Sequence, residues 1–145
     1  MPWKRAPLWA LILPLLATAC GSRAPDQPSI TRAGRYVLVT VNDRALPAVY
    51  YSSANLTLRA HYDTLFFSAT DMTYSERALI GQQEGGQPEL TSRVTGSAPS
   101  FSFTQPSPNT VEIPEFIGGS ATGQLTSASL VLTTPAGQRW FYRAG

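Results

Sequence analysis

The chain has 145 residues, a single cysteine and a formal net charge of +2. This length corresponds to one domain of ordinary size. Charged residues make up only 14% of the chain and form no long run of like sign, which excludes the basic arms and patches that proteins use to bind nucleic acids.

The N-terminus has the three parts of an export signal. Lys4 and Arg5 form a short basic start, an apolar run covers residues 6–16, and residues 17–19 (Ala-Thr-Ala) precede Cys20. A secretory signal peptide has this order, with an apolar part of about 7–15 residues, whereas a membrane span needs about 20. We therefore predict that residues 1–19 are a signal peptide. An ordinary cleaved signal or a short anchor, with Cys20 incidental, is the alternative.

Residues 15–20 (Leu-Leu-Ala-Thr-Ala-Cys) resemble the lipobox of bacterial lipoproteins. The resemblance implies that Cys20 carries a diacylglycerol on its sulfur, becomes the first residue of the mature protein, and usually gains a third chain on its amine. Two or more acyl chains hold a protein stably on a membrane. Gly21, in place of the aspartate that marks inner-membrane retention, implies the outer membrane of the bacterial envelope. Whether the protein would lie on the periplasmic face or the surface face of that membrane stays open.

Residues 20–33 are predicted to form a lipidated flexible tether. Residues 21–33 are polar and contain two prolines, a composition typical of coil. Such a coil spans about 20 Å at 5–6 Å × √n. From Cys20 onward the chain carries nine arginines and nine acidic residues, so the mature protein is close to neutral. Acylation of Cys20 would leave no thiol for a disulfide.

From residue 36 onward, short apolar or alternating segments are separated by glycine, proline and asparagine, the pattern of strands and turns. His61, Tyr62 and Asp63 are predicted to form a turn, and the only stretch with helical character runs from Tyr74 to Gln83. About eight to ten short strands indicate a sandwich or a closed antiparallel barrel. The expected strands are residues 36–41, 56–60, 64–69, 90–95, 100–104, 110–113, 121–125, 129–133 and 138–143.

Residues 34–47 read G-x-Y-x-L-x-x-V-N-D-x-x-L-P. This segment resembles the opening of small lipocalin-like barrel domains of bacterial lipoproteins, which commonly have glycine where Asp43 stands. Residues 53–68 resemble their second hairpin and residues 130–143 their closing hairpin. The resemblance implies that residues 34–145 form an all-β, antiparallel, up-and-down (lipocalin-like) barrel of about 8–10 short strands.

No pattern in the sequence indicates a catalytic, metal or cofactor site. His61 is the only histidine, and a turn would not fix it as a catalytic base. Glu112 and Glu115 are predicted to be surface charges rather than the acid pair of a glycosidase. Asp63 and Asp71 lie in no calcium-loop pattern. We therefore expect no enzyme, no metal and no cofactor.

Two strands allow a prediction of which face is buried. Trp140 and Tyr142 alternate with Arg139 and Arg143. A tryptophan and a tyrosine hide much apolar area, whereas a buried arginine needs a partner, so the aromatic pair is predicted to face the core. By the same alternation, Leu56 and Leu58 are predicted to face inward, and Thr57 and Arg59 outward.

Three functions stay open. The first is a module that binds a small apolar or amphiphilic molecule in the barrel mouth, because an eight-stranded barrel can hold one ligand. The second is a protein-interaction module with a solid-packed barrel, such as an envelope-assembly accessory or a hydrolase inhibitor. The third, an enzyme, is the least favoured. The expected contact with the membrane is through the acyl chains on Cys20, and no nucleic-acid partner is expected.

Overall fold

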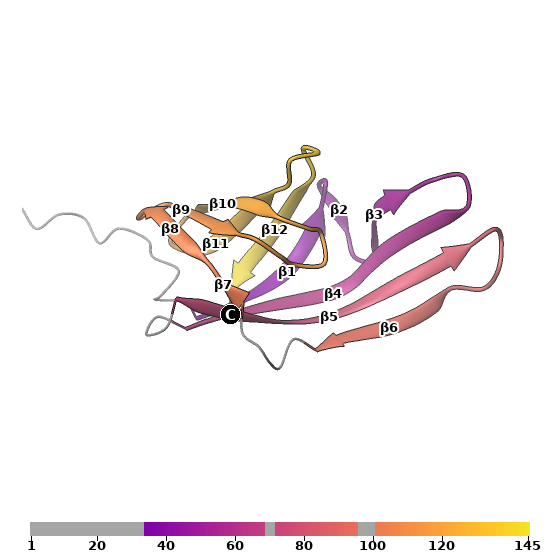
Figure 1. Ribbon diagram of the computed structural model, residues 1–145, viewed down its shortest axis with the longest axis horizontal. Helices are drawn as coiled ribbons and strands as arrows, with labels where there is room; N and C mark the ends of the chain where they lie inside the picture. The colour runs from indigo at the N-terminus through magenta and orange to yellow at the C-terminus, as the bar shows by residue number, and fades with distance from the viewer. Residues whose placement is uncertain (1–33, 69–71, 96–100) are drawn as a thin grey trace, which may run out of the picture.

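The computed structural model describes residues 34–68, 72–95 and 101–145 (Figure 1). Cys20, the predicted signal peptide, the predicted tether and Asp71 lie outside these residues. The described part consists of strands and connections, and it contains no helix that is long and apolar enough to cross a membrane. The strands are β1 (Arg35–Val41), β2 (Arg44–Ala45), β3 (Ala48–Ser52), β4 (Leu56–Ser68), β5 (Thr73–Glu84), β6 (Leu90–Thr95), β7 (Phe101–Ser102), β8 (Thr104–Ser107), β9 (Thr110–Ile113), β10 (Ala121–Leu125), β11 (Ser129–Thr133) and β12 (Arg139–Ala144).

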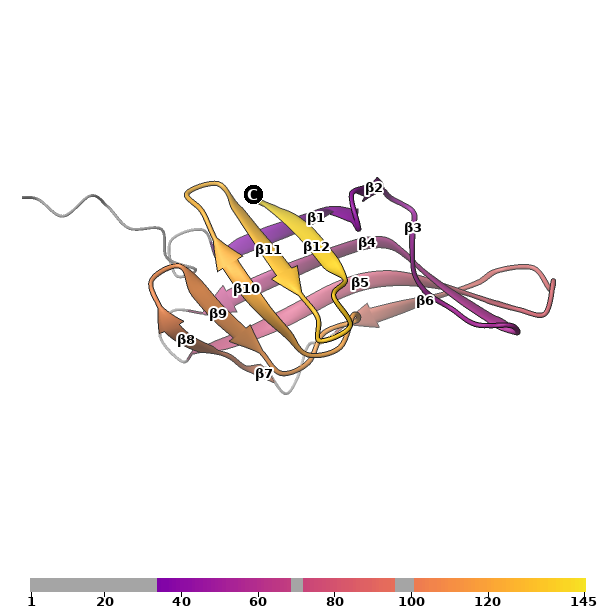
Figure 2. The same cartoon turned by 90° about the horizontal axis from the view of Figure 1, so that it is seen from above.

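The described strands belong to one antiparallel sheet that is curled into a half-barrel (Figure 1 and Figure 2). Its path runs β6-β5-β4-β1-β12-β11-β10-β9-β8, with β2 beside β1, β3 beside β4 and β7 beside β5. β12 pairs with β1, which joins the last strand to the first. β7 pairs with β5 and β8 pairs with β9, so residues 101–107 connect the two sides of the curled sheet. The predicted all-β, antiparallel, up-and-down fold is confirmed.

Aromatic and aliphatic side chains fill the interior of the curled sheet. Trp140 and Tyr142 are fully buried, while Arg139 and Arg143 are exposed, so the predicted orientation of β12 is confirmed. Burying this pair removes a large apolar area from water, which stabilises the closing strand. The other buried hydrophobic residues of the core cluster are Tyr36, Leu38, Val41, Ala48, Tyr50, Ala60, Leu65, Phe67, Tyr74, Phe103, Val111, Ile113, Phe116, Ala121, Leu125, Leu130 and Leu132.

The predicted end of the first strand at Asn42 and Asp43 is a tight turn between β1 and β2. Both residues have positive φ, 51° and 62°, as two-residue hairpin turns of the primed type require. Asn42 donates its N–H to the Arg139 carbonyl oxygen at 2.7 Å, and its side-chain Oδ1 accepts the Arg139 N–H at 2.8 Å. The turn therefore also fixes the start of β12.

β4 is one continuous strand of 13 residues, so the predicted turn at His61, Tyr62 and Asp63 is wrong. The register against β5 shifts between Ala60 and Tyr62. A β-bulge of this kind inserts one extra residue and lets the strand continue. As a result, Ala60 and Asp63 are both buried, although strict alternation would place them on opposite faces.

The first half of β4 is less sharply divided between two faces than predicted. Residues 56–59 are all half-buried. Leu58 packs against the core as predicted. Arg59 points to the opposite face as predicted, where an ion pair with Glu89 keeps it partly covered.

The stretch from Tyr74 to Gln83 lies within β5 and is not helical, so the helical character read from its sequence is misleading. Tyr74, Glu76 and Ala78 are buried, and the residues between them are more exposed, which is the period of a strand. β5 pairs with β4 along almost its whole length. This pairing satisfies its backbone and overrides the local helix propensity.

The β4–β5 hairpin extends beyond the half-barrel, as Figure 1 and Figure 2 show. β3 pairs with residues 57–60 of β4, and β6 pairs with residues 77–82 of β5. We call this four-stranded extension, in the order β3-β4-β5-β6, the arm. Its inner face meets the half-barrel at the connection between β9 and β10.

Candidate functional site

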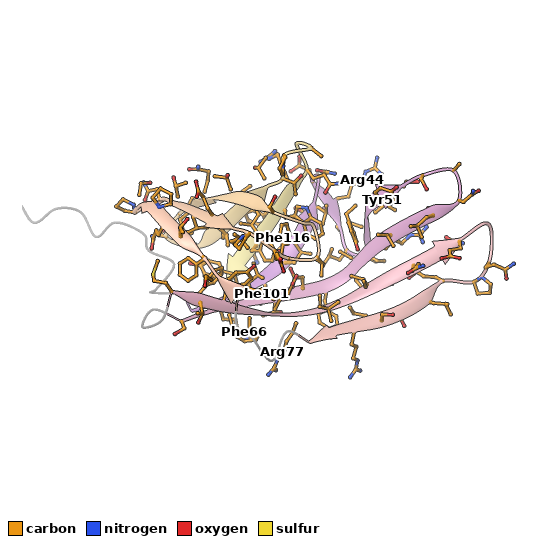
Figure 3. The ribbon with its side chains drawn as sticks, in the orientation of Figure 1. Arg44, Tyr51, Phe66, Arg77, Phe101 and Phe116 are labelled. Atoms are coloured by element: carbon orange, nitrogen blue, oxygen red, sulfur yellow. The ribbon has the colours of Figure 1, made fainter. Side chains whose placement is uncertain are left out.

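A pocket of about 330 Å³ lies where the inner face of the arm meets residues 114–120, which connect β9 and β10. Its aromatic wall is formed by Tyr50, Phe101 and Phe116, its aliphatic wall by Ile80, Val94 and Ile117, and its acidic groups are Glu76 and Glu115. Figure 3 shows Phe101 and Phe116 on the inner side of the β4–β5 hairpin, whereas Phe66 and Arg77 lie on its outer side. We call this hollow the Glu76 pocket.

Glu76 and Asp63 form a buried carboxyl pair at the wall of the pocket. Glu76 is 3% exposed and Asp63 is 0% exposed. In the β4–β5 ladder, Asp63 lies opposite Ala78 and Glu76 lies opposite Leu65, so the two acids are diagonal neighbours on the inner face. Their side chains hydrogen bond to each other. The two acidic groups are therefore held together inside an apolar interior.

Two further donors fix the carboxyl pair. The Tyr142 hydroxyl donates to Asp63 Oδ2 at 2.5 Å, and the Ile117 N–H donates to Glu76 Oε1 at 2.9 Å. Asp63 Oδ1 accepts no hydrogen bond from any N–H or O–H group of the described residues. The hydrogen bond between the Asp63 and Glu76 carboxyl groups needs a proton on one of them.

The interior changes how both acids titrate. Burial raises the pKa of Asp63 well above its ordinary value of 3.8, and the negative charge of Glu76 raises it further. Burial also raises the pKa of Glu76, from 4.5 to about 7, while the hydrogen bonds from the Ile117 N–H and Asp63 limit the rise. The pair consequently holds one proton on Asp63 and, above neutral pH, one negative charge on Glu76.

Residues 115–117 are fixed against β5, so the pocket wall is preformed. The Tyr74 hydroxyl donates to the Glu115 carbonyl oxygen and accepts the Glu115 N–H at 3.2 Å. Phe116 packs edge-to-face on Trp140, with ring centroids 5.2 Å apart. A Cβ on Gly118 would lie 2.6 Å from the Phe116 ring and 2.7 Å from the Trp140 ring, so this close approach requires glycine.

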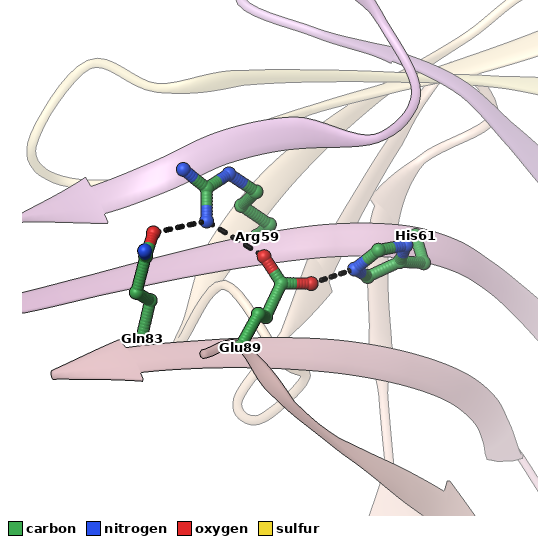
Figure 4. A network of polar contacts seen from close by, with 4 residues as sticks. All are labelled: Arg59, His61, Gln83 and Glu89. Carbon is green, nitrogen blue, oxygen red and sulfur yellow. Dashed lines mark hydrogen bonds and ion pairs between the residues drawn. The ribbon is translucent and has the colours of Figure 1, made fainter. Parts of the chain in front are cut away.

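His61 lies on the outer face of the arm, opposite the Glu76 pocket, and not in a solvated turn (Figure 4). Its Nε2 contacts Glu89 Oε1, and the hydrogen bond lowers the pKa of Glu89. Arg59 Nη1 donates to Glu89 Oε2 at 2.6 Å and to Gln83 Oε1 at 3.1 Å. Gly81 leaves the space for this contact, because a Cβ there would lie 2.1 Å from Glu89 Oε1. The network ties the β5–β6 connection to the sheet.

The other acidic residues singled out in the sequence have different surroundings. Glu112 and Glu115 are exposed, in agreement with the prediction of surface charge. Glu112 accepts a hydrogen bond from the Thr104 hydroxyl at 3.0 Å on the outer face of β9. Asp63, which fits no motif, is in contrast one of the most deeply buried groups of the described chain.

Sequence reasoning missed the carboxyl pair, although both acids follow a detectable pattern. Asp63 alternates with Leu65 and Phe67, and Glu76 alternates with Tyr74 and Ala78, so each carboxylate lies on the apolar face of a strand. A charged residue in such a position is rarely buried without a partner. A carboxylate on the apolar face of a strand was therefore the sequence signal that could have revealed the pair.

Two other hollows are larger but contain no buried charged group. A groove of about 640 Å³ lies on the outer side of β8 to β11, around Glu112, Thr122 and Thr133. A hollow of about 400 Å³ lies between Tyr51, Leu58 and residues 118–120 and 134–138. Among the residues that the structure describes, no group of three or more His, Cys, Asp or Glu side chains could hold a metal ion.

No protein-family model, no curated protein and no solved structure matches this chain. Its function is therefore inferred from the geometry and chemistry of the pocket.

Proposed function

We propose that this protein is a lipid-anchored, non-enzymatic binding protein of the bacterial cell envelope, and that the Glu76 pocket takes up a small apolar or amphiphilic molecule. The observation that carries the proposal is a preformed, largely apolar pocket with one buried carboxyl group in its wall. Pockets for small molecules combine apolar and aromatic walls with a few fixed polar groups.

The size and rigidity of the pocket support this role. Its volume of about 330 Å³ falls at the lower end of the 300–1,000 Å³ that ligand pockets occupy, which suits a molecule with one ring or a short chain. The wall residue Phe116 is packed on Trp140, and Ile117 is hydrogen bonded to Glu76. A pocket whose walls are already ordered loses little conformational freedom on binding.

Recognition is a better use of the carboxyl pair than catalysis. The described residues that line the pocket include no serine, cysteine, histidine or lysine that could act as a nucleophile beside Glu76. The partners of the pair are a tyrosine hydroxyl and a backbone N–H, which orient it. The proposal therefore assigns Glu76 a role in holding a ligand, with no cofactor.

The cellular setting of the proposal rests on the N-terminal sequence. Acyl chains on Cys20 would anchor the protein, and residues 20–33 would separate the barrel from the lipid surface by about 20 Å. We place it on the outer membrane because Gly21 follows the cysteine. In this setting the ligand would be a molecule that enters, leaves or is built in the envelope.

Binding of 2-phenylethanol to the full chain tests the pocket. Calorimetry would be run on the chain in phosphatidylcholine nanodiscs, with empty nanodiscs as the blank. Ile80→Trp fills the pocket, and Leu79→Trp places the same ring on the outer face of β5. We expect saturable binding to the wild type and to Leu79→Trp, and at least about ten-fold weaker binding to Ile80→Trp. Equal binding to both variants, or no binding to the wild type, would overturn the proposal.

A protein-interaction role is the second candidate, and the edge of the arm favours it. In the described part, β6 pairs with β5 on one side only, and Leu90 at its start is 72% exposed. An edge strand offers unpaired backbone groups to a strand of another protein. A photo-crosslinker at Ser92 on this edge would capture a partner in intact cells, whereas one at Thr122, on the opposite side of the fold, would not. The same pattern from both positions would count against this role.

A further inference from the structure

We propose that the Glu76 pocket selects ligands that carry a protonated amine on a small apolar or aromatic body. The inference rests on the proposed function and adds the chemical class of the ligand. It follows from the charge, the hydrogen bonding and the shape of the pocket.

The charges around the pocket have one sign. Glu76 and Glu115 are the ionisable acids of its wall, Asp63 lies behind Glu76, and the described lining contains no lysine, arginine or histidine. Of the described ion pairs, none involves Asp63 or Glu76. A charge in a low-dielectric site that lacks a counterion is costly. A cation that enters the pocket is therefore stabilised by electrostatic attraction to this charge, which a neutral molecule is not.

The other groups that face Glu76 do not compensate its charge. Tyr142 of β12 donates to Asp63, and burial raises the pKa of Tyr142, which therefore stays neutral. Tyr74 of β5 and Tyr50 of β3 also have raised pKa values, in each case first because of burial. Glu115, from the β9–β10 connection, adds only further negative charge. The elements packed around Glu76 thus supply acids and neutral phenols.

The hydrogen bonds leave room for a donor. A carboxylate has about four acceptor sites, and Glu76 uses one for the Ile117 N–H and one for Asp63. An ammonium group carries three donors and fits the sites that remain. A ligand carboxylate offers only acceptors and would be repelled by Glu76. A hydroxyl would hydrogen bond without neutralising the charge.

The aromatic wall also suits a cation. Tyr50, Phe101 and Phe116 surround the apolar part of the pocket, and Tyr50 and Phe116 are both packed on Trp140. Aromatic faces attract a nearby ammonium group and pack against an apolar ligand body. The amine would therefore lie at Glu76, and the ring or chain of the ligand would lie among these side chains.

Three probes of similar size and the same phenyl ring test the ligand class: 2-phenylethylamine, 2-phenylethanol and 3-phenylpropionate. Each is titrated by calorimetry into the full chain in phosphatidylcholine nanodiscs at pH 8 and pH 5.5. We expect the amine to bind at pH 8 at least about ten-fold more tightly than the alcohol, and the acid more weakly than either. From pH 8 to pH 5.5 amine binding should weaken by up to about 30-fold, because Glu76, with a pKa of about 7, is about nine-tenths ionised at pH 8 and about one-thirtieth ionised at pH 5.5. The amine itself stays protonated over this range.

Two variants identify the carboxyl group responsible. Glu76→Gln should reduce amine binding to the level of the alcohol and leave alcohol binding within about two-fold. Glu115→Gln, at the exposed rim, should weaken amine binding less than Glu76→Gln does, and Glu112→Gln, on the outer face of β9, is the matched control that should leave it unchanged. The pH series on the wild type needs no variant, so it still tests the ligand class if Glu76→Gln does not fold.

The outcomes separate the two proposals. Three results would overturn the inference and leave the pocket a neutral binding site. These are equal affinities for the amine and the alcohol, a higher affinity for the acid than for the amine, and an affinity for the amine that is the same at both pH values. Binding by none of the three probes would overturn the proposed function, and with it the inference. Amine binding lost in Glu115→Gln but kept in Glu76→Gln would also overturn the inference, because it would move recognition to the exposed rim.

Discussion

The replacement Glu76→Gln should stabilise the protein at high pH, because the wild type keeps an ionisable group in a place that disfavours its charge. Glutamine has nearly the same shape as glutamate. Its amide oxygen can accept the Ile117 N–H, as Glu76 Oε1 does in the wild type. The substitution therefore removes the charge and keeps the hydrogen bond from Ile117.

The magnitude follows from the pKa of Glu76, which is 4.5 in an unfolded chain and about 7 in the folded protein. Between these values the folded state binds more protons than the unfolded state, so the free energy of unfolding falls as the pH rises. A pKa difference of one corresponds to 1.36 kcal/mol, so the loss is complete above pH 7 and amounts to about 3 kcal/mol. The stabilising effect of glutamine should be near zero at pH 4.5 and should approach about 3 kcal/mol at pH 8.

Urea denaturation of the full chain at pH 4.5, 6, 7 and 8, followed by circular dichroism, measures this difference. Titrating groups other than Asp63, whose pKa the charge of Glu76 raises, are common to both proteins, so the difference curve reports on the carboxyl pair. Glu112→Gln is the control, because the exposed Glu112 should shift the curve by no more than about 0.5 kcal/mol at any pH. Parallel curves for wild type and Glu76→Gln, or a variant that is less stable at pH 8, would refute the reasoning.

Other predictions concern the core, the first turn and the anchor. Gly123→Ala should destabilise the protein by about 1–3 kcal/mol in the same urea assay, because its Cβ would lie 2.5 Å from Val111 Cγ2, while Thr122→Ala on the exposed side should cost much less. Asp43→Gly should stabilise the protein by about 0.5–1 kcal/mol, since Asp43 has a φ of 62° and glycine adopts this conformation without steric cost; a lower melting temperature would contradict this. Cys20→Ser should move the protein out of the membrane fraction or stall its processing, and equal palmitate labelling of wild type and variant would rule out acylation at this residue.

The regular part of the fold could be predicted from the sequence because its signals are local. In the C-terminal third, short alternating strands are separated by glycine and proline turns, and the strand at residues 138–143 was placed to within one residue. The orientation of Trp140 and Tyr142 followed from comparing two faces, since one of them carried two arginines. Neither step needed information from distant parts of the chain.

The candidate site could not be predicted, because it depends on a long-range pairing and a one-residue irregularity. The bulge at His61 allows two predicted strands, residues 56–60 and 64–69, to form one continuous strand. It also turns Asp63 to the inner face. His-Tyr-Asp is polar and resembles a turn until the partner strand is known. Glu76 in turn lies in a stretch with helical propensity, and only pairing with β4 makes it part of a strand that faces the interior. The pairing of β4 with β5 brings the two acids together, and no local sequence motif indicates this pairing.

The central claim is that Glu76 is an ionisable recognition group in a pocket that binds an amine, and its side-chain carboxyl ¹³C shift tests this most directly. The shift would be followed from pH 5 to pH 9 in the full chain, with and without saturating 2-phenylethylamine. We predict that Glu76 titrates with a pKa of about 7 in the free protein and that the bound ammonium group moves its titration to lower pH. A carboxyl that titrates near 4.5 in the free protein, or one whose titration the amine leaves unchanged, would contradict the account.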